Sequence, residues 1–236
     1  MTTTAATTVP EGTEVPPAGP RRSPLRIALA AVVAVALVVL GGAGAVALGI
    51  GHQDLPAADS VDAGFARDMS THHLQGVEMA NLALNRAVDP EVRSIAFDIS
   101  ATQTNQVGRM QGWLALWGVP LSGGTPMSWI GGTGSAAGHD MSGMGTGQNG
   151  LMPGMATEDE LTELGTLTGT AFDVQFLRLM IRHHQGGRPM AEYAAAHAQL
   201  PVVRGLARSI ADTQTAETTT MAGILTRLGG TPLPPP

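Results

Sequence analysis

Apolar residues recur at every third or fourth position over residues 61–83, a spacing that is typical of a helix with one buried face. A second helix is predicted to begin at Asp89-Pro90-Glu91, because this run offers an N-cap acceptor, a proline at the first helical position and an acid in the first turn. Its apolar positions continue to Leu114, and Gly118 can end it. No alternation of apolar and polar residues of strand length occurs, so the pattern predicts an all-α protein.

The same pattern returns 111 residues further along the chain. An ungapped comparison of residues 62–118 with residues 173–229 gives 23 identities in 57 positions, which indicates an internal repeat. In the second copy, Pro201 opens and Gly229 closes the last predicted helix. Because each helix hairpin has one apolar face to bury, we expect the two hairpins to pack as a four-helix bundle.

The N-terminal part of the chain differs in composition. Residues 1–24 are rich in Thr and Pro, and we expect them to form a disordered cytoplasmic tail. Residues 25–50 are almost uncharged and long enough to form a transmembrane signal anchor. Arginines just before this run favour a cytoplasmic N-terminus and an extracytoplasmic remainder. A cleaved signal peptide is the alternative, because small residues near position 45 resemble a cleavage site, and it also places the remainder outside the cytoplasm.

A Met- and Gly-rich loop, residues 122–156, lies between the two repeats, and its glycines disfavour regular structure. Thr157 and Glu160 then form a capping-box pattern that predicts a short extra helix. The remaining predicted parts are a linker over residues 51–59, the duplicated bundle over residues 60–229 and a Pro-rich tail over residues 230–236.

Composition narrows the classes of function. The chain has no cysteine, which excludes disulfides and thiolate ligands. Charges of both signs are scattered over the exported part without a basic run, so nucleic acid is not an expected partner. The chain instead contains 12 methionines and seven histidines, and their placement indicates the candidate chemistry.

Histidine and methionine gather on the predicted buried face of each repeat. At about 100° per residue, the members of the first repeat fall within a sector of roughly 120°. The two matching sets are Met69, His72, His73 and Met79, and Met180, His183, His184 and Met190. If an approximate two-fold axis relates the hairpins, the two histidine pairs approach each other across the bundle.

These residue types predict a particular class of metal. Buried imidazoles need partners. Thioether sulfur and neutral imidazole suit Cu(I) and, by analogy, Ag(I), whereas carboxylates suit harder ions. Because neutral imidazole is the form that binds metal, affinity is expected to weaken as the pH falls through about 6.5.

The loop between the repeats offers more ligands of the same kind. They are His139, Met141, Met144, Met152 and Met155. Glycine-rich surroundings are expected to expose these thioethers and let them converge on one ion. The loop is therefore predicted to collect ions that the histidines of the bundle hold.

Structural roles stay open for the same residues. Paired histidines can be hydrogen-bonded core residues, and methionines at helical spacing can be core filler. Asp62 and Asp173 are interpreted as first-turn helix acids rather than ligands. An enzyme is not expected, because Glu78 lies opposite Met69 on its helix and no Glu-x-x-His, His-Glu-x-x-His or nucleophile-elbow motif occurs.

The doubled pattern F-x-x-x-M-x-x-H-H-x-x-G-x-x-M-A resembles the family catalogued as domain of unknown function 305, over roughly residues 60–229. This resemblance implies a ferritin-like helical bundle, often exported or membrane-anchored, with some members associated with periplasmic copper binding and copper or silver tolerance. It also implies that the eight bundle residues named above are the metal-associated positions. One departure is Pro189, where we expect the helix to kink or restart, which affects the placement of Met190.

The sequence therefore predicts an extracytoplasmic protein that binds a copper ion, preferably Cu(I) or Ag(I), for sequestration or transfer. The expected partners are the metal ion, the membrane through the N-terminal anchor and a copper-handling protein. The alternatives are a structural or partner-binding bundle with core histidines, and a ferritin-like metal-dependent oxidoreductase.

Overall fold

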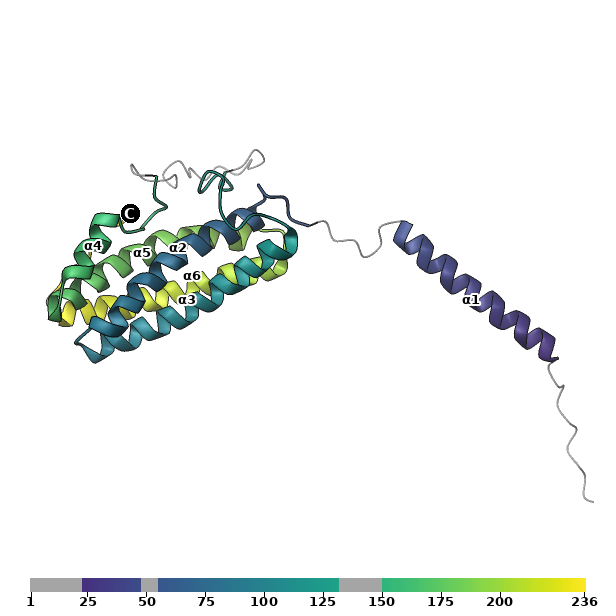
Figure 1. Cartoon of the computed structure of the whole chain (residues 1–236), viewed down its shortest axis with the longest axis horizontal. Helices are drawn as coiled ribbons and strands as arrows, with labels where there is room; N and C mark the ends of the chain where they lie inside the picture. Colours follow the sequence, from purple (N-terminus) through teal and green to yellow (C-terminus); the bar gives the residue numbers. More distant parts are fainter. Residues whose placement is uncertain (1–22, 48–54, 132–149) are drawn as a thin grey trace, which may run out of the picture. The chain divides into compact units, whose positions relative to one another are not determined.

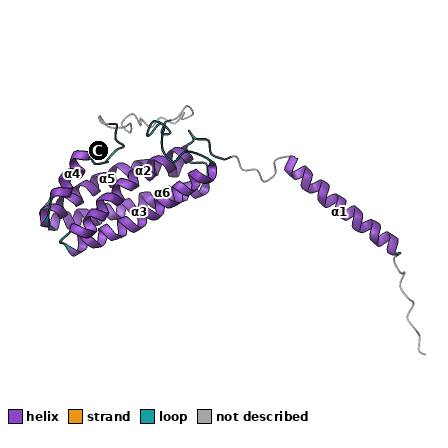
Figure 2. Ribbon diagram, in the orientation of Figure 1, coloured by secondary structure: helices purple, strands orange, loops and turns teal. Residues whose placement is uncertain are grey.

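The computed structural model describes residues 23–47, 55–131 and 150–236, and these residues contain six α-helices and no strand (Figures 1 and 2). The predicted all-α class is therefore confirmed. The chain divides into two compact units, Met1–Asp54 and Leu55–Pro236.

In the residues that the structure describes, the first unit contains one helix, α1, Pro24–Ala47. Its 24 residues have a mean hydropathy of 2.6, and none of them is buried. At 1.5 Å per residue it is long enough to cross a hydrocarbon core of about 30 Å. Its length and composition suit either a membrane span or a signal sequence near the N-terminus. Residues 1–22 of the tail predicted over residues 1–24 lie outside the described residues. So do residues 48–54, which include the end of the predicted anchor and the start of the predicted linker.

The second unit is a four-helix bundle made of two hairpins. The helices are α2 (Val61–Arg86), α3 (Pro90–Trp117), α5 (Gly169–His197) and α6 (Pro201–Arg227). Helix α2 packs against α3 and α5 against α6, while the two hairpins meet mainly between α2 and α5 (Figure 1). The short α4, Glu158–Thr166, precedes the second hairpin.

Helix boundaries follow the signals in the sequence. The Asp89 carboxylate accepts hydrogen bonds from the amides of Glu91 and Val92 at the start of α3. Gly118 ends α3 with a φ of 67°, a left-handed conformation that glycine adopts without strain. Thr157 and Glu160 form both hydrogen bonds of the predicted capping box before α4.

Two aspartates, one from each hairpin, form hydrogen bonds to the backbone of the opposite hairpin. Asp62 accepts hydrogen bonds from the amides of Gln199 (2.8 Å) and Leu200 (2.9 Å), just before α6. Asp173 accepts from the amides of Val88 (3.2 Å) and Asp89 (2.8 Å), just before α3. Asp62 does lie in the first turn of α2, but Asp173 is the fifth residue of α5, so the first-turn interpretation is wrong for Asp173. Both carboxylates are occupied by amides of the opposite repeat, and α2 and α5 consequently run antiparallel.

The apolar core has two parts, each built from both hairpins. One part contains Met69 and Met190, and the other contains Met79 and Met180. All four side chains are fully buried. In both α2 and α5 the histidine pair lies in sequence between these methionines, so the histidines occupy the middle of the bundle.

Pro189 does not interrupt α5, which is continuous from Gly169 to His197. The predicted restart of the helix is therefore wrong. Met190 is fully buried in the same part of the core as Met69, its counterpart across the antiparallel helix pair.

Candidate metal centre

The four paired histidines form one layer at mid-bundle. Each of His72, His73, His183 and His184 is fully buried. The rings of His72 and His183 lie against each other with centroids 3.9 Å apart, although 111 residues separate them in sequence. The predicted approach of the two pairs is confirmed.

The Nε2 atoms of the two central histidines contact main-chain oxygens. His183 Nε2 lies 2.9 Å from the carbonyl oxygen of His72, and His72 Nε2 lies 3.0 Å from that of Pro153. A carbonyl oxygen can only accept a hydrogen bond, so each Nε2 carries the proton and donates it. In the neutral ring the lone pair then belongs to Nδ1.

The two outer histidines follow the same scheme with side-chain acceptors. His73 Nε2 donates to Gln106 Oε1 (2.8 Å), and His184 Nε2 donates to Glu217 Oε2 (2.7 Å). Gln106 and Glu217 occupy matching positions in the two repeats. Carboxylates, amides and backbone carbonyls that accept from the second ring nitrogen are the groups that orient metal-binding histidines in proteins.

The four Nδ1 atoms are buried, and none has a hydrogen-bond partner within residues 23–47, 55–131 and 150–236. Burial, which disfavours the charged form, lowers the pKa of His72 from 6.5 to about 4 and that of His73 to about 3. Burial and the neighbouring His72 also hold the pKa of His183 well below 6.5. These three imidazoles are therefore neutral at neutral pH. Protons compete with a metal ion for them only at a pH lower than the value of about 6.5 that the sequence predicts.

Two glutamines that sequence reasoning did not single out as site residues border this layer. Gln103 and Gln214 occupy matching positions and are buried. Each glutamine side chain lies close to a glycine: a Cβ built on Gly76 would overlap Gln103 Oε1, and a Cβ built on Gly187 would lie 2.9 Å from Gln214 Nε2. The signal was present in the sequence as the repeated Thr-Gln-Thr, but a glutamine within a helix does not by itself reveal which way it faces.

The predicted ligands of the loop are only partly described by the structure, and the two described methionines are less exposed than predicted. His139, Met141 and Met144 lie outside the described residues. Met152 is only 5% exposed and packs in the core with Met69, and Met155 is half-buried, so the predicted exposure of these two thioethers is wrong.

A strap, residues 152–156, causes this burial by docking onto α2 and α5. Gly186 makes room for it, because a Cβ there would overlap Pro153 O. Gln75 holds it from the other side, accepting from the Ala156 amide (2.7 Å) and donating to the Ala156 carbonyl (2.9 Å). Gln75 and Gly186 occupy the same position in the two repeats. Because one residue hydrogen-bonds the strap and the other leaves space for it, the duplicated bundle accommodates a single strap.

Within the part of the chain that the structure describes, no three His, Asp or Glu side chains are grouped closely enough to hold a metal ion. A site in the layer therefore has to combine imidazole with other donors, and the thioethers on either side are of the required kind. Glu78 is exposed, as its helical position predicts.

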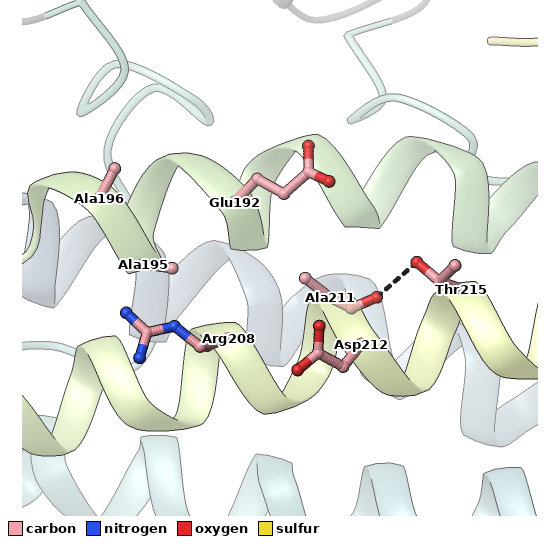
Figure 3. A pocket seen from close by; sticks show the side chains of 7 residues that line it. All are labelled: Glu192, Ala195, Ala196, Arg208, Ala211, Asp212 and Thr215. Carbon is pink, nitrogen blue, oxygen red and sulfur yellow. Dashed lines mark hydrogen bonds between the residues drawn. The ribbon is translucent and has the colours of Figure 1, made fainter.

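An open surface groove of about 320 Å³ is lined by residues of α5 and α6 (Figure 3). Its lining includes Glu192, Arg208 and Asp212, with Thr215 donating to the Ala211 carbonyl at 2.8 Å. No histidine or methionine lines this groove, so none of the predicted ligands lies there.

Comparison with known proteins supplies the family. Residues 62–225 match the domain of unknown function DUF305. A predicted secreted DUF305 protein from Streptomyces coelicolor is 42% identical with a TM-score of 0.65, and the match covers 75% of this chain and 99% of that one. A DUF305 fragment from Deinococcus radiodurans is 34% identical with a TM-score of 0.56, covering 71% and 96%.

A third similar structure is CopM in its Cu(I)-bound form, which is 25% identical with a TM-score of 0.54, covering 72% of this chain and 98% of CopM. A comparison with curated proteins found no match. The family match spans well over half of the chain and agrees with the doubled His-His pattern, so this chain belongs to the DUF305 family.

Proposed function

We propose that this protein is an extracytoplasmic metal-binding protein that holds Cu(I) or Ag(I) for sequestration or transfer. The observation that carries the proposal is the layer of four buried histidines, each with Nε2 engaged and Nδ1 without a protein partner in the described residues. A buried lone pair without a partner is costly, and coordination of a metal ion removes that cost.

The donor set favours a soft monovalent ion. Met69 and Met190 on one side of the layer, and Met79 and Met180 on the other, bring thioethers from both hairpins. Thioether and neutral imidazole are ligands that suit Cu(I). CopM, a similar structure at 25% identity, has been captured with Cu(I), which supports the same class of ion here.

The role that follows is binding rather than catalysis, with copper as cargo. We propose that α1 remains uncleaved as a membrane anchor, because its apolar run exceeds the usual core of a signal peptide. A copper-handling protein is then the expected donor or acceptor of the ion. Recovery of the full-length chain in the membrane fraction, with residues 55–236 accessible to protease added outside the cell, would support this; a shorter soluble product would contradict the anchor.

A structural role for the histidines is the competing candidate. It rests on the four hydrogen bonds of the Nε2 atoms. One joins the two hairpins, one joins α2 to the strap, and the other two join the paired helices within each hairpin. This role explains the engaged nitrogens but not the four Nδ1 atoms.

A competition titration on the full chain in detergent distinguishes the two functions. The chain is titrated with Cu(I), Ag(I) and Zn(II) against chelators of known affinity, with bound metal counted by elemental analysis. The metal-binding function predicts saturable Cu(I) and Ag(I) binding that is tighter than Zn(II) binding. Absence of bound Cu(I) and Ag(I) in the folded chain would leave the structural role.

A further inference from the structure

Gln103 and Gln214 are buried, and their side chains form no hydrogen bond in the described parts of the chain. Both the oxygen and the nitrogen of each amide are without a partner. A buried amide without a hydrogen bond destabilises the folded state, so two of them at matching positions need an explanation.

Each glutamine lies close to a histidine of the opposite repeat. A Cβ built on Gly76 would overlap Gln103 Oε1 and lie 3.1 Å from His183 Cε1. A Cβ built on Gly187 would lie 2.9 Å from Gln214 Nε2, 3.1 Å from Gln214 Oε1 and 3.0 Å from His72 Cε1. Each glycine therefore brings an amide of one hairpin and an imidazole of the other to the same point.

The neighbouring histidine atoms are also without partners. Nδ1 of His183 and Nδ1 of His72, bonded to those Cε1 atoms, are among the buried nitrogens that no described residue contacts through a hydrogen bond. An imidazole with an unpaired Nδ1 and an unpaired amide group thus lie beside the same glycine twice, once at Gly76 and once at Gly187.

We propose that Gln103 with His183, and Gln214 with His72, form mixed oxygen and nitrogen ligand pairs for a divalent first-row ion of the Cu(II) type. This inference rests on the proposed metal-binding function and extends it to a second oxidation state. Imidazole nitrogen with a hard oxygen donor suits Cu(II), while the thioethers suit Cu(I). The layer thereby binds the divalent ion through its glutamines and the monovalent ion through its methionines.

The test compares Cu(II) and Cu(I) affinities in two double variants of the full chain in detergent. Gln103→Leu/Gln214→Leu removes the amide oxygens at nearly constant volume. Gln103→Glu/Gln214→Glu retains an oxygen donor and adds charge. The melting temperature of each metal-free variant is measured on the same samples.

In the leucine variant we expect Cu(II) affinity to fall by about 10-fold or more, with Cu(I) affinity unchanged. Its metal-free melting temperature should be equal to or above that of the parent chain, because unpaired buried polar groups have been removed. In the glutamate variant Cu(II) should stay bound with altered g and hyperfine values in its electron paramagnetic resonance spectrum.

Unchanged Cu(II) affinity in the leucine variant overturns the inference. A lower melting temperature of that variant with unchanged Cu(II) binding would assign the glutamines to hydrogen bonding through internal water instead. If the leucine variant does not fold, an unaltered Cu(II) spectrum in the glutamate variant overturns the inference equally. Cu(I) binding by the parent chain is read separately, so loss of the proposed function and loss of this inference are distinguishable.

Discussion

The imidazoles of His72 and His183 stack across the middle of the bundle with their centroids 3.9 Å apart and their planes inclined by 37°. They hold the same position in the two repeats and belong to antiparallel helices. Two imidazolium cations at this distance would repel each other strongly. The contact therefore favours neutral imidazoles, which are the form that binds a metal ion, and this preference links the fold to its candidate chemistry.

Stability should depend on pH between about 6.5 and 5. The pKa values of His72, His73 and His183 are lowered by burial, so the unfolded chain takes up protons in this range while the folded chain does not. Stability is then full above the ordinary histidine pKa of 6.5 and declines as the pH falls, by up to about 1.4 kcal/mol per pH unit for each such histidine. Urea unfolding of the metal-free chain at pH 7.5, 6.0 and 5.0 measures this slope.

The exposed His197 supplies a control for this effect. His197→Ala should leave the pH slope unaltered, whereas His72→Ala/His183→Ala should reduce it. A parent chain whose stability is constant from pH 7.5 to 5.0 would show that the layer accepts protons without opening.

The strap should detach when Gly186 becomes alanine. The new Cβ would overlap Pro153 O, so we expect Gly186→Ala to expose residues 152–156 and to lower stability by about 1–3 kcal/mol. Hydrogen exchange of the Met155 and Ala156 amides reports the opening. Gly205→Ala is the matched control, since a Cβ at Gly205 meets nothing within 4 Å and alanine favours the helix. Equal protection of these amides in both variants would mean that the strap tolerates the extra carbon.

The two aspartates that join the hairpins should affect stability without affecting metal. Asp62→Ala or Asp173→Ala leaves two amides without their acceptor, and we expect each change to lower the free energy of unfolding by about 1–3 kcal/mol. Cu(I) affinity should stay at the parent value, and the exposed Asp212→Ala should change neither quantity. Weaker Cu(I) binding in the folded aspartate variants would count the carboxylates among the ligands.

The repeat made most of the fold predictable, because the ungapped alignment assigns the helices of the first hairpin to the equivalent residues of the second. It also placed the histidines correctly, since their helical phase matches that of the core methionines. Three features depend on long-range contacts that no local pattern encodes. These are the crossing of Asp173 to the other repeat, the burial of Met152 beneath a Gly-rich segment and the inward direction of Gln103.

The ion-collecting role of the loop stays a prediction. Met141→Leu/Met144→Leu removes two thioethers at nearly constant volume, and we expect fewer Cu(I) ions per chain with an unchanged melting temperature. The strap and Trp129 dock on the bundle through their own contacts, so the fold should not depend on these two side chains. Ser142→Ala in the same segment is the control. An unaltered Cu(I) count in the double variant would remove the loop from the metal pathway.

The central claim is that the paired histidines are ligands, and a Cu(I) competition titration on His183→Ala/His184→Ala tests it most directly. The same titration on His72→Ala/His73→Ala should give a similar result, because the repeat gives both pairs the same helical context. Lost hydrogen bonds and new cavities are expected to lower the free energy of unfolding of both variants by about 2–5 kcal/mol. Thermal melts of both samples therefore measure how much of each variant is folded. The account predicts that Cu(I) affinity of the folded variants falls by about 10-fold or more. Cu(I) affinity equal to that of the parent chain in a folded double variant would contradict it and make the histidine layer structural.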